Sequence, residues 1–230
     1  MLNLIGIIVA SYLIGSIPFA LIVGKIFKRI DIRNYGSGNL GSTNAFRVLG
    51  IPLGILVQML DISKGLFAVL VVTRIFYPDL PFENYTPFED ITVLKIISGL
   101  SAVIGHTYSV FVNFKGGKGI NTALGMLISL APVEVGISVG FFIITLLASG
   151  YVSLGSIVAS FFFPVIMFIR ENIFKVDIYG YNTLIFFSIG ISILLIYNHR
   201  DNIKRLLYGK ENRFEKLWLI RIFKIKAPFS

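Results

Sequence analysis

Three polar segments of the chain contain residue types that bind phosphate. The first runs from Asn34 to Asn44, is followed by Arg47, and reads NYGSGNLGSTN. Its glycines allow positive φ and let backbone N–H groups approach an anion closely, while Ser, Thr and Asn side chains add hydrogen-bond donors. A flexible Gly/Ser linker has no need of donors at this density. The segment therefore predicts an anion-binding loop.

The second polar segment combines a histidine with a glycine-rich turn. Gly105 and His106 are followed by Gly-Gly-Lys-Gly at residues 116–119, just before an apolar stretch. A helix that begins near Ile120 directs its N–H groups and positive dipole end at an anion bound by this turn. The Gly-x4-Gly-Lys-Ser/Thr spacing of a nucleotide-binding loop is absent, which predicts phosphate without a nucleotide. His106 is either a packing residue or a group for catalysis or ligation, and an ionisable side chain at membrane depth favours the second.

The third polar segment, residues 198–205, reads NHRDNIKR. On one helix, Asn198, Asn202 and Arg205 share a face and His199 lies beside Asn202. A basic flank that anchors lipid headgroups is the alternative, but headgroup attraction does not require a face of His, Asn and Arg. We expect this segment to bind a ligand.

Two opposite charges interrupt one apolar stretch. Asp61 and Lys64 are three residues apart, a spacing at which they can pair and so become tolerable in a membrane. The pattern leaves open whether the pair is structural or part of a substrate site. Glu134 is a lone acidic residue close to a proline, so we place it at a helix break and expect no chemistry from it.

The elements that position these segments are those of an all-α, multi-spanning membrane protein. Of the 230 residues, 55% are hydrophobic and 14% charged, where a soluble domain has about a quarter charged. The mean hydropathy is +0.82. No basic residue precedes the first apolar stretch and Lys25 follows it, which predicts a retained helix with its N-terminus outside. The apolar stretches are residues 4–23, 51–72, 96–112, 120–149, 152–169 and 181–197.

Charge bias predicts an odd number of membrane crossings. The loops after the first and third stretches are basic, whereas the loop at residues 79–90 is acidic. Residues 199–230 hold nine Lys and Arg against three Asp and Glu, so we expect the C-terminus in the cytoplasm. The stretch 120–149 exceeds the roughly 20 residues of one span and contains Pro132, so it is a candidate for two short or broken helices. We predict seven crossings, with five as the alternative, and all three polar segments on the cytoplasmic side.

The composition limits the metals, cofactors and partners that the chain can be expected to bind. The chain has no cysteine and only two histidines, so we expect no disulfide, no thiolate metal site and no histidine-rich metal site. We also expect no cofactor. The basic end of the chain favours anionic lipids over nucleic acid. Residues 1–213 are expected to form the membrane domain, and residues 214–230 a basic amphipathic tail at the interface.

Together, the three segments resemble the bacterial acyl-phosphate-dependent glycerol-3-phosphate acyltransferases. That family has a Gly-Ser-Gly-Asn-x-Gly-x-Thr-Asn loop, a Gly-His…Phe-x-Gly-Gly-Lys-Gly segment and a C-terminal His-Arg-x-Asn-Ile-x-Arg-Leu segment. These motifs correspond here to residues 36–44, 105–119 and 199–206, within a resemblance that covers residues 1 to about 213. Ser109 and Asn121 stand where the family usually has proline and alanine.

The resemblance implies transfer of the acyl chain of an acyl phosphate to the sn-1 hydroxyl of glycerol 3-phosphate. The products are lysophosphatidic acid and phosphate, in the first step of bacterial phospholipid synthesis. It also implies a seven-helix protein of the bacterial cytoplasmic (inner) membrane whose active site faces the cytoplasm and uses no metal. The expected partners are the two substrates and the lipid bilayer.

Donor type and location suggest a role for each motif residue. An acyl phosphate is already activated, so the enzyme mainly positions substrates and stabilises charge, and no Ser-His-Asp arrangement is needed. The catalytic candidates are His106, Ser37 and Lys118, with either His106 or the substrate's own phosphate accepting the hydroxyl proton. Glycerol 3-phosphate is assigned to Lys64, His199, Asn202 and Arg205. The acyl phosphate is assigned to Ser37, Gly38, Asn39, Thr43, Asn44, Arg47, Gly116, Gly117, Lys118 and Gly119.

A transporter of phosphate or an organic phosphate is the chief alternative, because broken helices and glycine loops also build transport sites. Against it, the polar motifs lie in cytoplasmic loops, and the sequence contains no inverted repeat that we find. A CDP-alcohol phosphotransferase needs clustered aspartates, and Asp61 has no such companions. A purely structural membrane protein does not require donor-rich loops.

Overall fold

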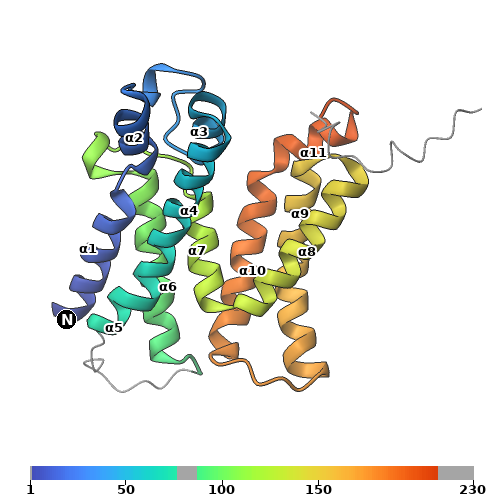
Figure 1. The fold of residues 1–230 in the computed structure, drawn as a ribbon. Helices are drawn as coiled ribbons and strands as arrows, with labels where there is room; N and C mark the ends of the chain where they lie inside the picture. Colours follow the sequence, from blue (N-terminus) through green and yellow to red (C-terminus); the bar gives the residue numbers. More distant parts are fainter. Residues whose placement is uncertain (1, 77–86, 212–230) are drawn as a thin grey trace, which may run out of the picture. The chain divides into compact units, whose positions relative to one another are not determined.

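The computed structural model describes residues 2–76 and 87–211, and these ranges contain helices and loops but no strand (Figure 1). The predicted all-α class is therefore confirmed. The chain divides into two compact units, Met1–Ala131 and Pro132–Ser230. The predicted tail at residues 214–230 lies outside the described residues.

The first unit is a bundle whose helices are joined by the two glycine-rich loops. Pro18 separates the first two helices, because proline lacks the N–H that would continue the helical bonding. The described elements are α1 (Leu2–Ser16), α2 (Phe19–Val23), η1 (Gly24–Lys28), η2 (Ile32–Asn34), α3 (Ser42–Leu49), α4 (Ile51–Phe67), η3 (Ala68–Val72), α5 (Thr73–Ile75), α6 (Asp90–Thr107), η4 (Val110–Val112) and α7 (Ile120–Leu130).

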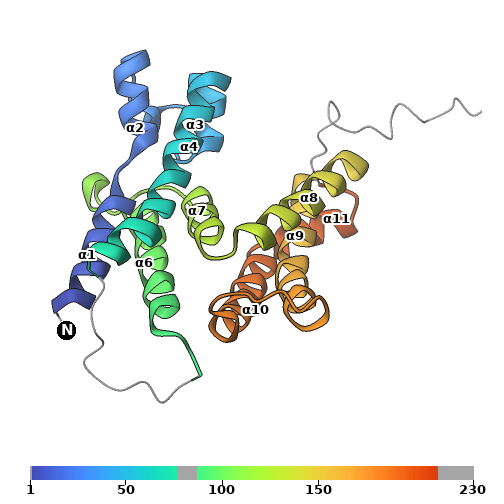
Figure 2. The same ribbon diagram turned by 60° about the horizontal axis from the view of Figure 1, so that its bottom comes forward.

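Glycines allow two pairs of helices in this unit to pack closely. Helix α1 packs against α6 and α4 against α7, as Figures 1 and 2 show. A side chain at Gly65 of α4 would collide with the backbone of α7, and one at Gly125 of α7 would collide with α4. Gly15 and Gly105 make the same reciprocal contact between α1 and α6. Small residues serve this purpose in membrane helix interfaces, where the gain comes from close van der Waals packing.

The break after α1 leaves two backbone carbonyls that other elements satisfy. Ser109 donates its hydroxyl hydrogen bond to the carbonyl of Ser16. The Lys64 ammonium donates to the carbonyl of Ile17 at 3.1 Å. The Ser109 hydroxyl therefore ties the loop after α6 to the end of α1.

Over its described residues, 132–211, the second unit contains three long α-helices and one short α-helix. Helices α8 (Pro132–Ser149), α9 (Val152–Phe168, followed by η5, Ile169–Ile173) and α10 (Tyr181–Asn198) pack in sequence, and α11 (Arg200–Leu207) follows. Glu134, 2% exposed, forms an ion pair with Arg170. The expectation that Glu134 is a lone residue was therefore wrong. Its partner lies 36 residues away, a distance over which sequence spacing carries no signal.

Five helices in the described residues are long and apolar enough to cross a membrane, namely Asn3–Lys28, Ile51–Ile75, Asp90–Val112, Pro132–Ser149 and Val152–Ile173. Helices α10 and α11 form a further bent pair, and α7 is apolar but has only 11 residues. The predicted division of residues 120–149 into two helices is confirmed, since α7 ends at Leu130 and α8 begins at Pro132. Seven crossings and an external N-terminus stay predictions.

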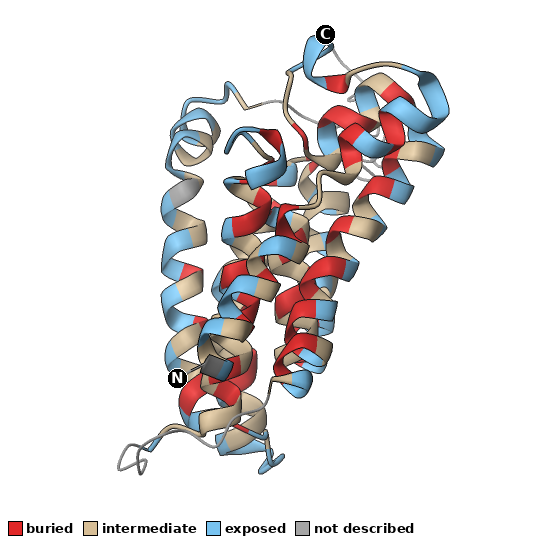
Figure 3. Ribbon diagram, turned by 90° about the vertical axis from the view of Figure 1, so that its left-hand side faces the viewer, coloured by how far each residue is buried: buried red, intermediate tan, exposed pale blue. Residues whose placement is uncertain are grey.

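The faces of these helices that other helices do not cover are largely apolar. Ile5 and Leu13 of α1, for example, are 57% and 42% exposed, and buried and exposed positions alternate around the helices in Figure 3. Exposed apolar side chains over a whole helix length are typical of a lipid-facing surface.

Candidate functional site

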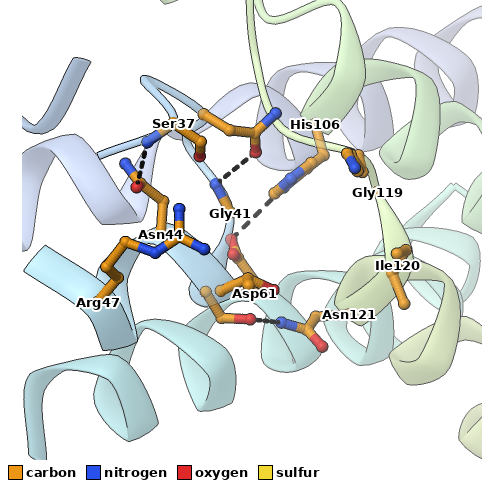
Figure 4. Close-up of a pocket in the computed structure, with 13 residues that line it drawn as sticks. Ser37, Gly41, Asn44, Arg47, Asp61, His106, Gly119, Ile120 and Asn121 are labelled. Atoms are coloured by element: carbon orange, nitrogen blue, oxygen red, sulfur yellow. Dashed lines mark hydrogen bonds and ion pairs between the residues drawn. The ribbon is translucent and has the colours of Figure 1, made fainter. Parts of the chain in front are cut away.

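The two glycine-rich loops of the first unit meet at one cavity of about 280 Å³ (Figure 4). In that view Asn44 and Arg47 lie on one side of the cavity, and His106 and Gly119 on the other. The lining residues are Ser37, Asn39, Gly41, Ser42, Thr43, Asn44, Arg47, Asp61, His106, Lys118, Gly119, Ile120 and Asn121. Segments that are far apart in the sequence thus form a single donor-rich site.

The first loop is folded around the side chain of Asn44. The Asn44 carbonyl oxygen accepts the N–H of Ser37 at 2.9 Å, and its amide nitrogen donates to the carbonyl of Tyr35 at 3.1 Å. Gly36 and Gly38 have φ of +62° and +69°, which favours glycine at both positions. Asn44 therefore braces the loop, and this bracing leaves the exposed Ser37 facing the cavity.

A small polar turn fixes the entry to this loop. The Asp31 carboxylate accepts the backbone N–H of Arg33 at 3.0 Å and pairs with its guanidinium at 2.6 Å. The hydrogen bond from the Arg33 side chain lowers the pKa of Asp31 to about 2. Asp31 thus stays ionised through the physiological range and holds the start of η2 in place.

The second loop folds back onto the end of α6. The N–H groups of Gly116 and Gly117 donate to the carbonyls of Thr107 and His106, both at 3.0 Å. Gly119 has φ +74° and precedes the first residue of α7, so this helix begins where the sequence predicts. The amide of Asn121 donates to the Ser42 hydroxyl at 2.8 Å and so joins the start of α7 to the start of α3.

This arrangement suits an anion. The N-terminus of α7 supplies N–H groups and the positive end of a helix dipole beside the cavity. Arg47 and Lys118 contribute two cations to the lining, and Ser37 and Thr43 contribute hydroxyls. The neighbouring Gly38 and Gly116 shape the two loops without lining the cavity.

Asp61, Lys64 and His106 form a buried cluster at the base of the site. Asp61 Oδ1 lies 3.0 Å from Lys64 Nζ and 3.5 Å from His106 Nδ1. The exposed fractions of the three side chains are 1%, 2% and 6%. The predicted pairing of Asp61 with Lys64 is confirmed, and the structure adds His106 as a third member.

Sequence reasoning did not assign five residues that line the cavity, namely Gly41, Ser42, Asp61, Ile120 and Asn121. Asp61 had a signal, since an acidic residue inside an apolar stretch is a functional candidate by default. Ser42 and Asn121 had weaker ones, because each lies in the first turn of a helix that follows a glycine-rich loop.

The third predicted segment belongs to the second unit, and the structure changes its local description. Helix α10 ends at Asn198 and α11 begins at Arg200, with a bend of 54° between the two helices. The prediction that Asn198 shares one helix face with Asn202 and Arg205 was therefore wrong. Asn202 and Arg205 do lie together on α11, three residues apart. The turn after α10 lets the His199 ring bond to the carbonyl of Leu195 at 2.8 Å.

Asn202 and Arg205 are brought together by Glu211. The Asn202 amide and the Arg205 Nε donate to the Glu211 carboxylate at 3.0 and 2.7 Å, and the Ser153 hydroxyl donates at 3.1 Å. Burial raises the pKa of Glu211, but these hydrogen bonds outweigh it and hold that pKa below its ordinary value. Of the residues assigned to glycerol 3-phosphate, only Lys64 lies in the first unit.

The fold and the site define a helical membrane protein with an anion site built from glycine-rich loops. A family model described as glycerol-3-phosphate acyltransferase matches residues 5–209. The glycerol-3-phosphate acyltransferase of Chlorobaculum tepidum is 46% identical over 228 residues, which cover 93% of this chain and 97% of that protein. That of Chlorobium chlorochromatii is 44% identical with the same coverage.

Two solved structures are similar over nearly the whole chain. Both are crystal structures of PlsY (YgiH), an integral membrane glycerol 3-phosphate acyltransferase, in its glycerol 3-phosphate and lysophosphatidic acid forms. Each is 36% identical, with TM-scores of 0.69 and 0.70 and coverage of 96% and 95% of this chain and 98% of that chain. The chain belongs to the glycerol-3-phosphate acyltransferase family, as its motifs predict, and is a multi-pass membrane acyltransferase.

Proposed function

We propose that this enzyme transfers the acyl chain of an acyl phosphate to the sn-1 hydroxyl of glycerol 3-phosphate, at the cytoplasmic face of the bacterial inner membrane. The observation that carries the proposal is the cavity in which two donor-rich loops converge with Arg47, Lys118 and the N-terminus of α7. Family membership favours an enzyme over the transporter alternative.

The cavity is suited to the phosphate of the acyl donor. In the reaction the hydroxyl oxygen attacks the acyl carbon, the bond from that carbon to the phosphate oxygen breaks, and phosphate leaves with the electron pair. Negative charge grows on the leaving oxygen and on the carbonyl oxygen. Ser37, Thr43, Arg47 and Lys118 offer preorganised donors for that charge, in a site that needs no nucleophilic side chain.

The Asp61 cluster gives His106 a defined role in this scheme. Asp61 faces Nδ1 of the ring at 3.5 Å, so it can hold the proton on that nitrogen and orient the ring. His106 then either accepts the hydroxyl proton directly or orients the site while the phosphate of glycerol 3-phosphate accepts it.

We assign the acceptor to Lys64, His199, Asn202 and Arg205. The solved relative in its glycerol 3-phosphate form supports an acceptor site within this family. Lys64 is already bonded to Asp61 and the carbonyl of Ile17, so it contributes mainly positive charge. The basic loops around Lys25 and Lys118 and the acidic loop at residues 79–90 support a cytoplasmic active site.

The direct test is to incubate the purified protein with an acyl phosphate and glycerol 3-phosphate and to measure lysophosphatidic acid and phosphate. Acyl-CoA replaces the acyl phosphate in a parallel reaction, which should give no product. Ser37→Ala, Lys118→Ala and His199→Ala should each lower the rate by roughly 10²-fold. Lys115→Ala is the matched control, because Lys115 is exposed and lies outside the cavity lining. Near-normal rates in all three folded variants would contradict the site assignment.

A further inference from the structure

The side chain of Glu211 is an acidic group among residues assigned to an anionic substrate. It is 9% exposed and accepts hydrogen bonds from donors on two helices, Ser153 at the start of α9 and Asn202 and Arg205 on α11. A carboxylate at the first turn of α9 also interacts favourably with the helix dipole. Glu211 thus fastens α11 to the start of α9.

The atoms that bond to Glu211 determine which atoms remain for a ligand. Among the described residues, Arg205 bonds to Glu211 through Nε, which leaves its two terminal amino groups for a phosphate. Asn202 bonds through its amide nitrogen, which leaves its carbonyl oxygen to accept a hydroxyl. The Arg205 side chain is 46% exposed, so its terminal groups are accessible. One carboxylate therefore fixes two side chains and leaves the end of each that matches glycerol 3-phosphate.

We propose that Glu211 is a positioning residue for glycerol 3-phosphate, which acts by fixing the orientation of Arg205 and Asn202 before the substrate binds. This inference rests on the proposed function, in which these two side chains bind the acceptor. Long side chains lose considerable rotamer freedom when they are immobilised, so a prior anchor lowers the entropic cost of binding.

A different interpretation is that the Glu211 carboxylate acts as a plug, which means that it occupies the binding position of the substrate phosphate and competes with it. The bonding pattern is against it, because a phosphate mimic would engage the terminal guanidinium groups, whereas Glu211 takes Nε. The two interpretations predict opposite changes in the KM for glycerol 3-phosphate when Glu211 is removed. Loss of an anchor raises the KM for glycerol 3-phosphate, and loss of a plug lowers it.

The experiment measures kcat and KM for both substrates with the full-length enzyme and its Glu211→Ala and Glu211→Gln variants. We expect Glu211→Ala to raise the KM for glycerol 3-phosphate roughly tenfold, with a change below about twofold in the KM for acyl phosphate and in kcat. Glu211→Gln keeps an acceptor oxygen, so its KM for glycerol 3-phosphate should lie between those of the wild type and Glu211→Ala. Asp201→Asn is the matched control, because it removes an exposed negative charge from the same helix and should leave both KM values unchanged.

A double-mutant cycle shows whether Glu211 acts through its partner. If it does, Glu211→Ala should add little to the KM of an Arg205→Ala enzyme. An unchanged or lowered KM for glycerol 3-phosphate, or fully additive effects in the cycle, would overturn the proposal. If Glu211→Ala does not fold, Ser153→Ala replaces it, since it removes one anchor of the carboxylate and should raise the same KM by about twofold. Failure of the proposed function is distinguishable, because the wild-type enzyme would then form no lysophosphatidic acid.

Discussion

The substitution Gly117→Ala tests whether the position of the His106 ring sets the rate. The φ of Gly117 lies outside the left-handed region, so the backbone itself accepts alanine. The new Cβ would lie 2.9 Å from Cδ2 and 3.0 Å from Cε1 of His106, and closer still to Nε2. This clash can be relieved only by a movement of the loop that carries residue 117 or of the His106 ring.

The expected magnitude follows from where the ring can move. Ordinary carbon contacts begin near 3.4 Å, so the ring must shift by roughly 1 Å. It has little room on its other side, where Nδ1 faces Asp61 at 3.5 Å. A misplacement of about 1 Å in a catalytic group can cost about 10²-fold in rate, which is the fall in kcat that we expect. Overpacking should lower the free energy of unfolding by about 1–3 kcal/mol.

The assay is release of phosphate from acyl phosphate with both substrates saturating, for Gly117→Ala, His106→Ala and the double variant. Because alanine at 117 acts through the ring, it should have no further effect once the ring is removed. Gly140→Ala in α8 is the control, since a Cβ there meets no atom within 4 Å. A wild-type kcat for Gly117→Ala, or a further large loss in the double variant, would refute this reasoning.

Three further predictions concern stability. Asp61→Asn leaves the Lys64 ammonium buried without its counter-ion, so the free energy of unfolding in detergent should fall by about 3–5 kcal/mol, and adding Lys64→Met should recover most of it. Ser109→Ala leaves the Ser16 carbonyl without its hydroxyl donor and should cost about 1–3 kcal/mol in thermal unfolding. The pKa of Glu211 is lower in the folded state than in the unfolded state, so the unfolded chain takes up the proton first as the pH falls. The Glu211 carboxylate should therefore stabilise the fold fully above pH 4.5, and this stabilisation should be lost as the pH falls further.

Each of these three has a specific contrary result. An Asp61→Asn/Lys64→Met protein that is no more stable than Asp61→Asn alone would show that the unpaired Lys64 charge is not the cause of the loss. For Ser109→Ala, the comparison is Ser156→Ala, because the Ser156 hydroxyl donates to the carbonyl of Val152 within its own helix, α9. Equal losses of stability in the two variants would be inconsistent with a special role for Ser109. For Glu211, the stability difference between wild type and Glu211→Gln should shrink below pH 4.5, and a constant difference would exclude the linkage.

Local chemistry in the sequence was sufficient for several parts of the molecule. The glycine-rich loops, the start of α7 at Ile120 and the break at residues 131–132 follow from rules that act within a few residues. The pairing of Asp61 with Lys64 also follows, since side chains three apart on a helix are neighbours. Such features need no knowledge of which helices pack together.

The features that the sequence did not predict depend on tertiary contacts. Glu134 forms its ion pair with Arg170 because α8 packs against α9. The bend at His199 has no proline or glycine to indicate it. Asn44 has the side chain of a phosphate ligand, but closure of its own loop uses both ends of the amide. The residue type predicts what a side chain can bond to, whereas the fold decides which partner it meets.

The glycines that pack the helices of the first unit also set the position of its polar cluster. Gly105 immediately precedes His106 on α6, and Gly65 immediately follows Lys64 on α4. The first glycine brings α6 against α1, and the second brings α4 against α7, whose N-terminus faces the cavity. A larger residue at either position would separate a helix pair and displace the neighbouring cluster residue with it. Close helix packing in this membrane enzyme is therefore a condition for the geometry of its site as well as for its stability.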